Sequence, residues 1–422
     1  MFTPQYYMNP TNRPNFLTNQ RTHQWLMMTA CVCMMVGFVA SRAMVSIGML
    51  TLVVVAVLHT SPVSLIKRFL NNAVLVSLTL FFWLVFISGF YSQNTTEWLH
   101  WLRIKVPFLV LPIAFAGLPK LTAKQLVILL YAYVLVFFIS TCAVLGNYFL
   151  HYDAVNQSFL SGSGIKMPYS HIRYSLMLCF SFFVALYLAR TSLYVKYEWE
   201  KNLMLLYAKF AFVSLHILAV RSGILALYIG LLFWLVVYVW QQKKYGVGFV
   251  VLIGLITLPV LAYQFSPTLQ NKWKYMVYNW NEFQKGNINY QYDGMRYMSI
   301  VNGIEVWKQN KILGCGAGDL TEEIHQMYAK TFPDLLPENQ LMPHNQIVWT
   351  MASTGILGVL LLLLAFFIPL TQHKNYHHIL LTVLSIIVFS SFLTEATLEE
   401  QMGTGFYLLF TLLFITSKQI NE

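Results

Sequence analysis

Residues 346–370 read QIVWTMASTGILGVLLLLLAFFIPL, and no charged side chain interrupts them. A helix needs about 20 apolar residues to cross the hydrocarbon core of a bilayer, so this stretch predicts a membrane-spanning helix. The whole chain of 422 residues has the same character, with 57% hydrophobic and 10% charged residues. Soluble domains carry about 25% charged residues. The composition therefore predicts an all-α polytopic membrane protein.

Similar apolar runs recur along the chain and predict about twelve spans. We place these spans at residues 25–41, 43–60, 73–91, 105–118, 124–149, 171–189, 203–219, 222–240, 246–263, 346–370, 377–394 and 403–417. The run 105–118 is short and contains Pro107 and Pro112, so we expect a kinked or re-entrant segment there.

Lysine and arginine in the short connections predict the orientation, because cytoplasmic loops are enriched in both. With a cytoplasmic N-terminus, the cytoplasmic side receives Lys67, Arg68, Lys120, Lys124, Arg190, Lys196, Lys201, Lys243, Lys244, Lys374 and Lys418. This solution places both ends in the cytoplasm. The predicted segments are a tail (1–24), spans one to nine (25–263), a large outer loop (264–345), spans ten to twelve (346–417) and a second tail (418–422).

The large loop (residues 264–345) is too long for a simple connector, and its sequence predicts helices. Apolar residues at helical spacing predict one amphipathic helix whose apolar positions are Tyr297, Ile300, Val301, Ile304 and Trp307. Three glycines at 314, 316 and 318 then interrupt the chain. Asp319 and Glu322 resemble a capping box, which predicts a second helix that ends before Pro333.

Several cations are expected at the outer face, where the orientation rule gives no reason for them. Arginine at the end of a membrane helix often extends its side chain to water without any function. For Arg221 this interpretation and a functional one are about equally supported. Arg296 alone would be an ordinary surface residue. Together with Arg221 it predicts a site for an anionic, membrane-embedded phosphate, because guanidinium groups bind phosphate oxygens in bidentate fashion. Further cations expected at this face are Arg103, Lys105, His171 and Arg173.

His344 precedes the tenth span, next to Asn345. The start of a helix presents free N–H groups and the positive end of the helix dipole, so we expect it to favour a phosphate. An imidazole there could accept a proton from an acceptor hydroxyl. A lone histidine is more often structural than catalytic, so this is a hypothesis.

The remaining polar features predict no further chemistry. Glu395, Glu399 and Glu400 form an acidic loop, which we expect to be solvated. The cysteines and carboxylates show no metal-ligand spacing, so we expect neither a metal nor a cofactor. The glycine run at 314–318 follows no predicted strand and is not expected to bind a nucleotide. No nucleic-acid motif accompanies the net charge of +11.

Three stretches resemble the superfamily of O-antigen ligases and O-antigen polymerases, which are bacterial membrane glycosyltransferases. They are LAVRSG (218–223), Arg296 with Trp307 and the glycines at 314–318, and PHNQ (343–346) followed by TGILG (354–358). Many members place a serine before the first arginine, whereas here Ser222 follows Arg221, so the register of that arginine is open by one residue.

The resemblance implies a metal-independent, inverting transferase in the bacterial inner membrane with a periplasmic active site. The expected donor is a glycan on undecaprenyl diphosphate, held by Arg221 and Arg296 with help from His171, Arg173, Arg103, Lys105 and Asn345. His344 is expected to activate the acceptor, a sugar hydroxyl of the lipid A-core in lipopolysaccharide biosynthesis. Membrane lipids are the other expected partners, and nucleic acid is not one.

The sequence leaves other acceptors open. An O-antigen polymerase would join repeat units to each other, and a protein O-oligosaccharyltransferase would modify a serine or threonine hydroxyl. A transporter is an interpretation from a different class, although the repeats and broken midplane helices of transporters are not clear in this sequence.

Overall fold

The computed structural model describes residues 19–159, 163–190, 198–289 and 292–417. Within these ranges the chain is helical and forms no strand, which confirms the prediction of an all-α polytopic membrane protein. The predicted N-terminal tail, Lys196 and Lys418 lie largely or wholly outside the described residues.

Helices coincide with the predicted spans. They are α1 (Gln20–Ala40), α2 (Arg42–His59), α4 (Ala73–Leu78) with α5 (Leu80–Ser88), α6 (Thr95–Gly117), α7 (Ala123–Leu150), α9 (His171–Arg190), α10 (Glu198–Leu218), α11 (Arg221–Gln242), α12 (Tyr245–Phe265), α16 (Gln346–Thr371), α17 (Ile379–Phe392) and α18 (Gln401–Thr416). The other helices are α3 (Pro62–Leu70), α8 (Tyr152–Ser158), α13 (Pro267–Gln284), α14 (Tyr292–Gln309), α15 (Leu320–Thr331) and the short 3-10 turn η4 (Thr397–Glu399).

Nine helices in the described part of the chain are long and apolar enough to cross a membrane. A tenth candidate is the bent pair formed by Pro62–Leu70 and Ala73–Ser88. Helices α17 and α18, with 14 and 16 residues, are shorter than the roughly 20 residues that a perpendicular span needs. The number of twelve crossings therefore stays a prediction.

Residues 105–118 do not form the kinked or re-entrant segment that was expected there. Helix α6 continues through Pro107 and Pro112 and begins at Thr95, ten residues before the predicted span. Asn94 caps it by accepting a hydrogen bond from the backbone N–H of Glu97. The sharp bend, 86°, falls instead between α3 and α4, beside Asn71 and Asn72.

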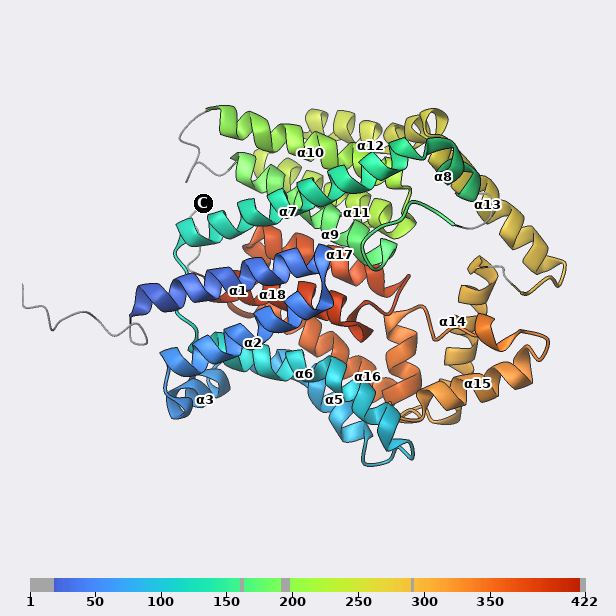
Figure 1. Cartoon of the computed structure of the whole chain (residues 1–422), viewed down its shortest axis with the longest axis horizontal. Helices are drawn as coiled ribbons and strands as arrows, with labels where there is room; N and C mark the ends of the chain where they lie inside the picture. The colour runs from blue at the N-terminus through green and yellow to red at the C-terminus, as the bar shows by residue number, and fades with distance from the viewer. Residues whose placement is uncertain (1–18, 160–162, 191–197, 290–291, 418–422) are drawn as a thin grey trace, which may run out of the picture.

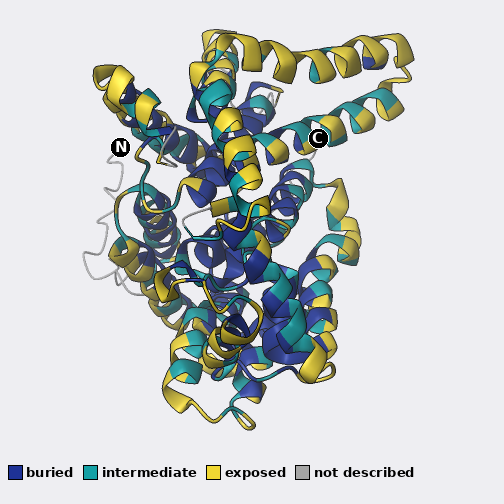
Figure 2. Cartoon of the chain, turned by 90° about the vertical axis from the view of Figure 1, so that its right-hand side faces the viewer, coloured by how far each residue is buried: buried dark blue, intermediate teal, exposed yellow. Residues whose placement is uncertain are grey.

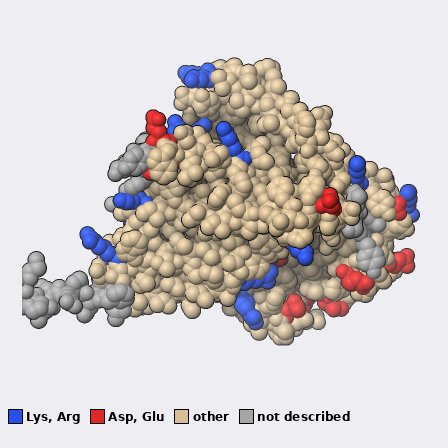
Figure 3. Space-filling model, turned by 45° about the horizontal axis from the view of Figure 1, so that its top comes forward, with Lys and Arg blue, Asp and Glu red and all other residues tan. Residues whose placement is uncertain are grey.

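The spans run side by side along the long axis of the molecule, and α13, α14 and α15 lie together at one end of it (Figure 1). Buried residues fill the interior of this bundle, and exposed ones line the helices at its periphery (Figure 2). Helix α9 is buried over almost its whole length, whereas in α12 only Gly248 is buried. Wide areas of the surface carry no charge, and most acidic side chains visible in Figure 3 lie toward the end that holds α13 to α15.

The large loop folds around a small core of its own. Residues from α14, α15 and the start of α16 form it, among them Met298, Ile324, Tyr328 and Trp349. Helices α14 and α15 form at the two predicted places, and the loop contains a third helix, α13, that was not predicted. The predicted apolar face of α14 is wrong, because Tyr297 is exposed and the buried face is made by Met295, Met298, Ser299, Asn302, Gly303 and Val306.

The capping box predicted for α15 does not form. The Asp319 side chain accepts no hydrogen bond from its own helix. Its carboxylate instead accepts hydrogen bonds of 2.8–2.9 Å from the backbone N–H groups of Gln93 and Asn94. This contact fastens the large loop to the turn between α5 and α6.

Helix α16 is broken at Gly355, whose φ of 67° lies in the left-handed region that favours glycine. The loop at residues 311–316 packs against this break, and the N–H of Cys315 donates to the carbonyl of Ala352 at 2.9 Å. A side chain at position 355 would collide with the carbonyl of Ile312. The glycine-rich run therefore satisfies backbone groups of a broken membrane helix, as apolar surroundings require.

Candidate functional site

Arg221 stands at the first position of α11, after a tight turn from α10. Ala219 in this turn has a φ of 52°, which reverses the chain within two residues. Two residues after Arg221, Gly223 faces Ser175 of α9 so closely that a Cβ would lie 2.5 Å from the Ser175 Cβ. Small residues permit such close helix contacts in membranes. The Arg-Ser-Gly sequence thereby holds Arg221 against the start of α9.

Arg221 forms an ion pair with Asp293 at the start of α14. The backbone N–H of Asp293 donates to the side chain of Asn279 on α13, at 3.1 Å, and Asn279 is fully buried. Beside this ion pair lies an open pocket of about 320 Å³. Its lining residues are Arg221, Met276, Val277, Trp280, Asn281 and Asp293. The pocket thus combines a guanidinium with an apolar wall from α13.

Arg296, one helical turn after Asp293, forms no ion pair with another described residue. No carboxylate among the described residues lies within 4 Å of its guanidinium, and its buried Nε has no hydrogen-bond partner there. Burial lowers the pKa of Arg296; Glu395 and Asp293 oppose this shift and Arg221 adds to it. Arginine stays charged at any physiological pH. The site therefore contains a positive charge that is not directly neutralised by any carboxylate in the described part of the chain.

His344 lies between α14 and the acidic loop (residues 393–400). Its backbone N–H donates to the hydroxyl of Ser299, one turn after Arg296, at 3.2 Å. Its Nδ1 lies 3.3 Å from a carboxylate oxygen of Glu395. His344 therefore contacts the helix that carries Arg296, α14. Both residues lie within electrostatic range of the Glu395 carboxylate.

The expectation that the acidic loop is solvated is wrong. The Glu395 side chain is only 12% exposed and lies 3.9 Å from Arg173, which also pairs with Glu400 at 3.1 Å. Burial raises the pKa of Glu395, but the contact with His344 and the charges of Arg173 and Arg296 outweigh it and hold the pKa below its ordinary value. Glu395 is therefore ionised near neutral pH and links Arg173 with His344.

Two further basic side chains complete the arrangement. His171, at the start of α9, lies within electrostatic range of Arg173, Arg296, Glu395 and Lys272. Lys272 on α13 was not predicted. Burial lowers its pKa, with Arg221 and Arg296 adding to the shift and Asp293 opposing it. We call the group Arg173, Arg221, Lys272 and Arg296 the cation cluster.

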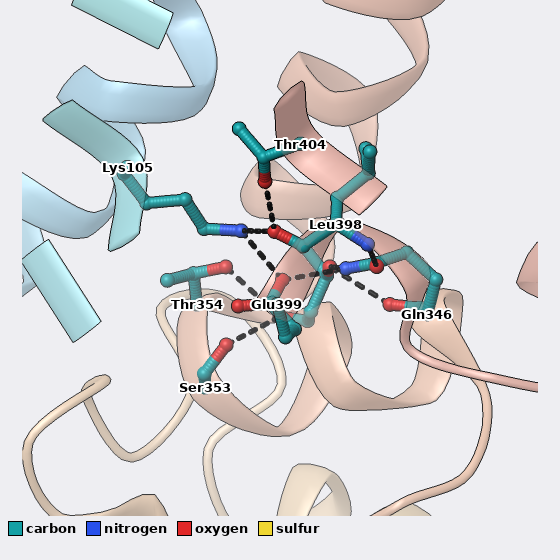
Figure 4. Close-up of polar contacts among 8 residues, drawn as sticks. Lys105, Gln346, Ser353, Thr354, Leu398, Glu399 and Thr404 are labelled. Atoms are coloured by element: carbon teal, nitrogen blue, oxygen red, sulfur yellow. Dashed lines mark hydrogen bonds and ion pairs between the residues drawn. The ribbon is translucent and has the colours of Figure 1, made fainter. Parts of the chain in front are cut away.

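The structure does not bring every predicted site residue to this cluster. Arg103 is exposed on α6. Lys105 is 2% exposed, and its ammonium is engaged with the Glu399 carboxylate and the Leu398 carbonyl, both at 2.8 Å (Figure 4). This position suits a structural ion pair better than the expected contact with substrate.

Asn345 is also engaged by the protein. Its side-chain oxygen caps α16 by accepting from the N–H groups of Ile347 and Val348, at 2.9 and 3.0 Å. Its amide nitrogen donates to the carbonyl of Leu393 at 3.3 Å. The cap thus uses two of the N–H groups that were expected to be free for phosphate at this helix start.

Sequence reasoning missed Lys272, Asp293 and Glu395, although each lies next to a predicted residue in space. Lys272 and Asp293 are in the large loop that was expected to hold the chemistry, but no spacing rule sets them apart from other charged residues there. Glu395 could have been predicted, since three carboxylates at the expected outer face of a membrane protein indicate that they pair with cations.

No three His, Cys, Asp or Glu side chains in the described part of the chain form a group that could hold a metal ion. The donors that converge here are mainly cationic, and such an arrangement suits phosphate oxygens.

Residues 206–363 match the family model described as O-antigen ligase. The matched range contains Arg221, Arg296 and His344, and it extends from α10 into α16. The match confirms the resemblance of this part of the chain to the O-antigen ligase and polymerase superfamily. No curated protein sequence matches the chain.

Proposed function

We propose that this protein is an O-antigen ligase-like glycosyltransferase that moves a glycan from undecaprenyl diphosphate to a sugar hydroxyl of the lipid A-core. The observation that carries this proposal is the Arg296 guanidinium, which lies among other cations and has no ion pair within 4 Å among the described residues. A diphosphate would supply the missing negative charge.

The pocket beside Arg221 suits a donor that is charged at one end and apolar at the other. Arg221 and Arg296 bind the diphosphate, and Lys272 adds positive charge from α13. Met276, Val277 and Trp280 form the apolar wall next to Arg221. The first part of the prenyl chain lies against this wall and continues into the surrounding lipid.

His344 activates the acceptor. Glu395 faces Nδ1 of the imidazole at 3.3 Å, which favours the tautomer with the proton on Nδ1 and leaves Nε2 as the base. Nε2 takes the proton of the acceptor hydroxyl while the oxygen attacks the anomeric carbon. The bond from that carbon to the diphosphate breaks, and undecaprenyl diphosphate leaves with its charge stabilised by the cation cluster. The attack occurs opposite to the leaving group, so the configuration inverts.

The membrane orientation belongs to the same proposal. The cation cluster and the large loop face the periplasm, and the opposite end of the bundle, with Lys67, Lys120, Lys243 and Lys374, faces the cytoplasm.

Transfer measured in vesicles with a lipid-linked glycan and lipid A-core tests the reaction. We expect His344→Ala and Arg221→Ala each to abolish transfer and to leave membrane insertion intact. Full activity in both variants would remove the proposal.

Surface polysaccharide from a deletion strain identifies the acceptor. A ligase leaves lipid A without long chains while lipid-linked polymer accumulates. Single-repeat products would instead identify a polymerase, and unmodified glycoproteins would identify a protein O-oligosaccharyltransferase.

A further inference from the structure

A buried polar cluster joins three distant parts of the chain next to the site (Figure 4). Gln346, the first residue of α16, donates to the Glu399 carboxylate at 2.7 Å and accepts from the N–H of Leu398 at 2.9 Å. Lys105 of α6 donates to the same carboxylate and to the Leu398 carbonyl. Thr404 of α18 donates to that carbonyl as well, at 3.0 Å. We call Lys105, Gln346, Leu398 and Glu399 the Lys105 cluster.

Stability does not explain this cluster. The Lys105 and Glu399 side chains are 3% and 6% exposed, so both charges have lost nearly all their water. Desolvation of such a pair offsets most of its Coulomb attraction, and apolar residues of similar size often stabilise a protein equally well. The best attested use of buried polar groups is to fix one arrangement of the chain.

This cluster lies between the two segments of the chain that carry His344 and Glu395. Gln346 follows His344 by two residues, and Glu399 follows Glu395 by four. The bond from Asn345 to the Leu393 carbonyl joins the same two segments on the other side. The segments that carry the His344–Glu395 pair are therefore fastened to each other, and Lys105 fastens both to α6.

We infer that Lys105, Gln346 and Glu399 are positioning residues for the proposed transfer reaction. Together they fix the position of the His344 imidazole relative to the Glu395 carboxylate. This inference rests on the proposed function. The three residues act through His344 and Glu395 and touch no substrate.

Two variants separate positioning from folding. Lys105→Met with Glu399→Gln removes both buried charges together, so neither is left unpaired. Gln346→Met changes no charge and removes the bonds of Gln346 to Leu398 and Glu399, while the bond from Asn345 to Leu393 remains. The matched control is Glu305→Gln with Lys308→Met, which removes an exposed ion pair of α14.

The measurements are the melting temperature in detergent, kcat and the KM for the lipid-linked donor. A misplacement of 1 Å costs up to about 100-fold in rate, so we expect kcat to fall by about 10- to 100-fold in both cluster variants. The donor KM should stay within about twofold of the wild-type value, because the cation cluster is unchanged. The double variant should melt close to the wild-type temperature, and the control should match the wild type in every measurement.

Wild-type kcat in the folded Gln346→Met protein would overturn the inference, as would a loss of activity that only follows the loss of folded protein. Should the double variant fail to fold, Gln346→Met decides alone. Absence of transfer by the wild-type protein would instead remove the proposed function, and this inference with it.

Discussion

The cation cluster and the Lys105 cluster lie at the same end of the bundle, but they differ in how a buried cation is compensated: Lys105 has an ion pair with Glu399, whereas Arg296 has none among the described residues. Around Lys105, the ammonium and one carboxylate oxygen of Glu399 are within hydrogen-bond distance of each other and of further protein groups. Around Arg296, several cations gather and the guanidinium lacks an ion pair among the described residues. A buried ion pair fixes one arrangement of the chain, whereas an unmatched charge is a site for a ligand.

Replacement of the unmatched cation should give the largest effect on activity. Loss of one group that stabilises developing charge costs about 10²- to 10³-fold in rate, so we expect Arg296→Met to lower transfer by that factor. Its melting temperature should not fall, because no ion pair is broken. Transfer and thermal melting of the purified protein measure both. Lys308→Met, an exposed cation on the same helix, serves as the control, and a collapse of the fold on replacement of Arg296 would contradict the comparison.

The paired cation should behave in the opposite way when it is replaced alone. Lys105→Met leaves the Glu399 carboxylate buried and uncompensated, which lowers the free energy of unfolding by about 3–5 kcal/mol. Adding Glu399→Gln should restore most of that stability. Denaturation in detergent micelles measures the three proteins side by side. A single Lys105→Met variant as stable as the wild type would show that an uncompensated Glu399 carboxylate costs no stability, which would contradict this prediction.

The carboxylate between the two clusters should give a smaller effect that depends on pH. The folded protein holds the pKa of Glu395 below its ordinary value, so its ionised form adds stability at pH values above the ordinary carboxylate pKa. This contribution disappears as the pH falls through the lowered folded-state pKa. Melting temperatures of wild type and Glu395→Gln should therefore differ most near neutral pH and converge in acid. A difference that stays constant with pH would contradict this assignment.

The exposed pair Glu305–Lys308 should give the smallest effect. Its side chains are 38% and 52% exposed, and surface ion pairs contribute about 0–1 kcal/mol. Glu305→Gln with Lys308→Met should change the free energy of unfolding by less than about 1 kcal/mol and leave transfer unchanged. A larger loss of stability would mean that exposed ion pairs stabilise this protein as much as buried ones do. The difference drawn between Arg296 and Lys105 would then have no support.

Apolar runs predicted the helices of the bundle well, because lipid contact demands them along the whole length of each span. The start of α6 was missed because Glu97, Arg103 and Lys105 lower the hydropathy of its first half. One of these charges is neutralised by Glu399, which lies 294 residues further along the chain. No local pattern contains that information.

The candidate site shows the same limit. Arg221, Arg296 and His344 were predicted to lie together. In the structure Arg221 pairs with Asp293, one turn before Arg296, and His344 contacts Ser299 and Glu395. The connecting residues were not predicted, since they depend on contacts between segments that are far apart in sequence. The cap at Asn345 is formed by neighbouring residues, but the sequence alone does not show that its side chain accepts from the N–H groups of the helix. That requires the backbone conformation.

Binding of polyprenyl diphosphate to the purified protein in detergent tests the central contrast most directly. The account predicts that Arg221→Met with Arg296→Met weakens binding by at least about tenfold, since two charge-assisted contacts are lost. It also predicts that Lys105→Met with Glu399→Gln binds like the wild type. Equal affinity in all three proteins, or weaker binding only in the Lys105 variant, would contradict it.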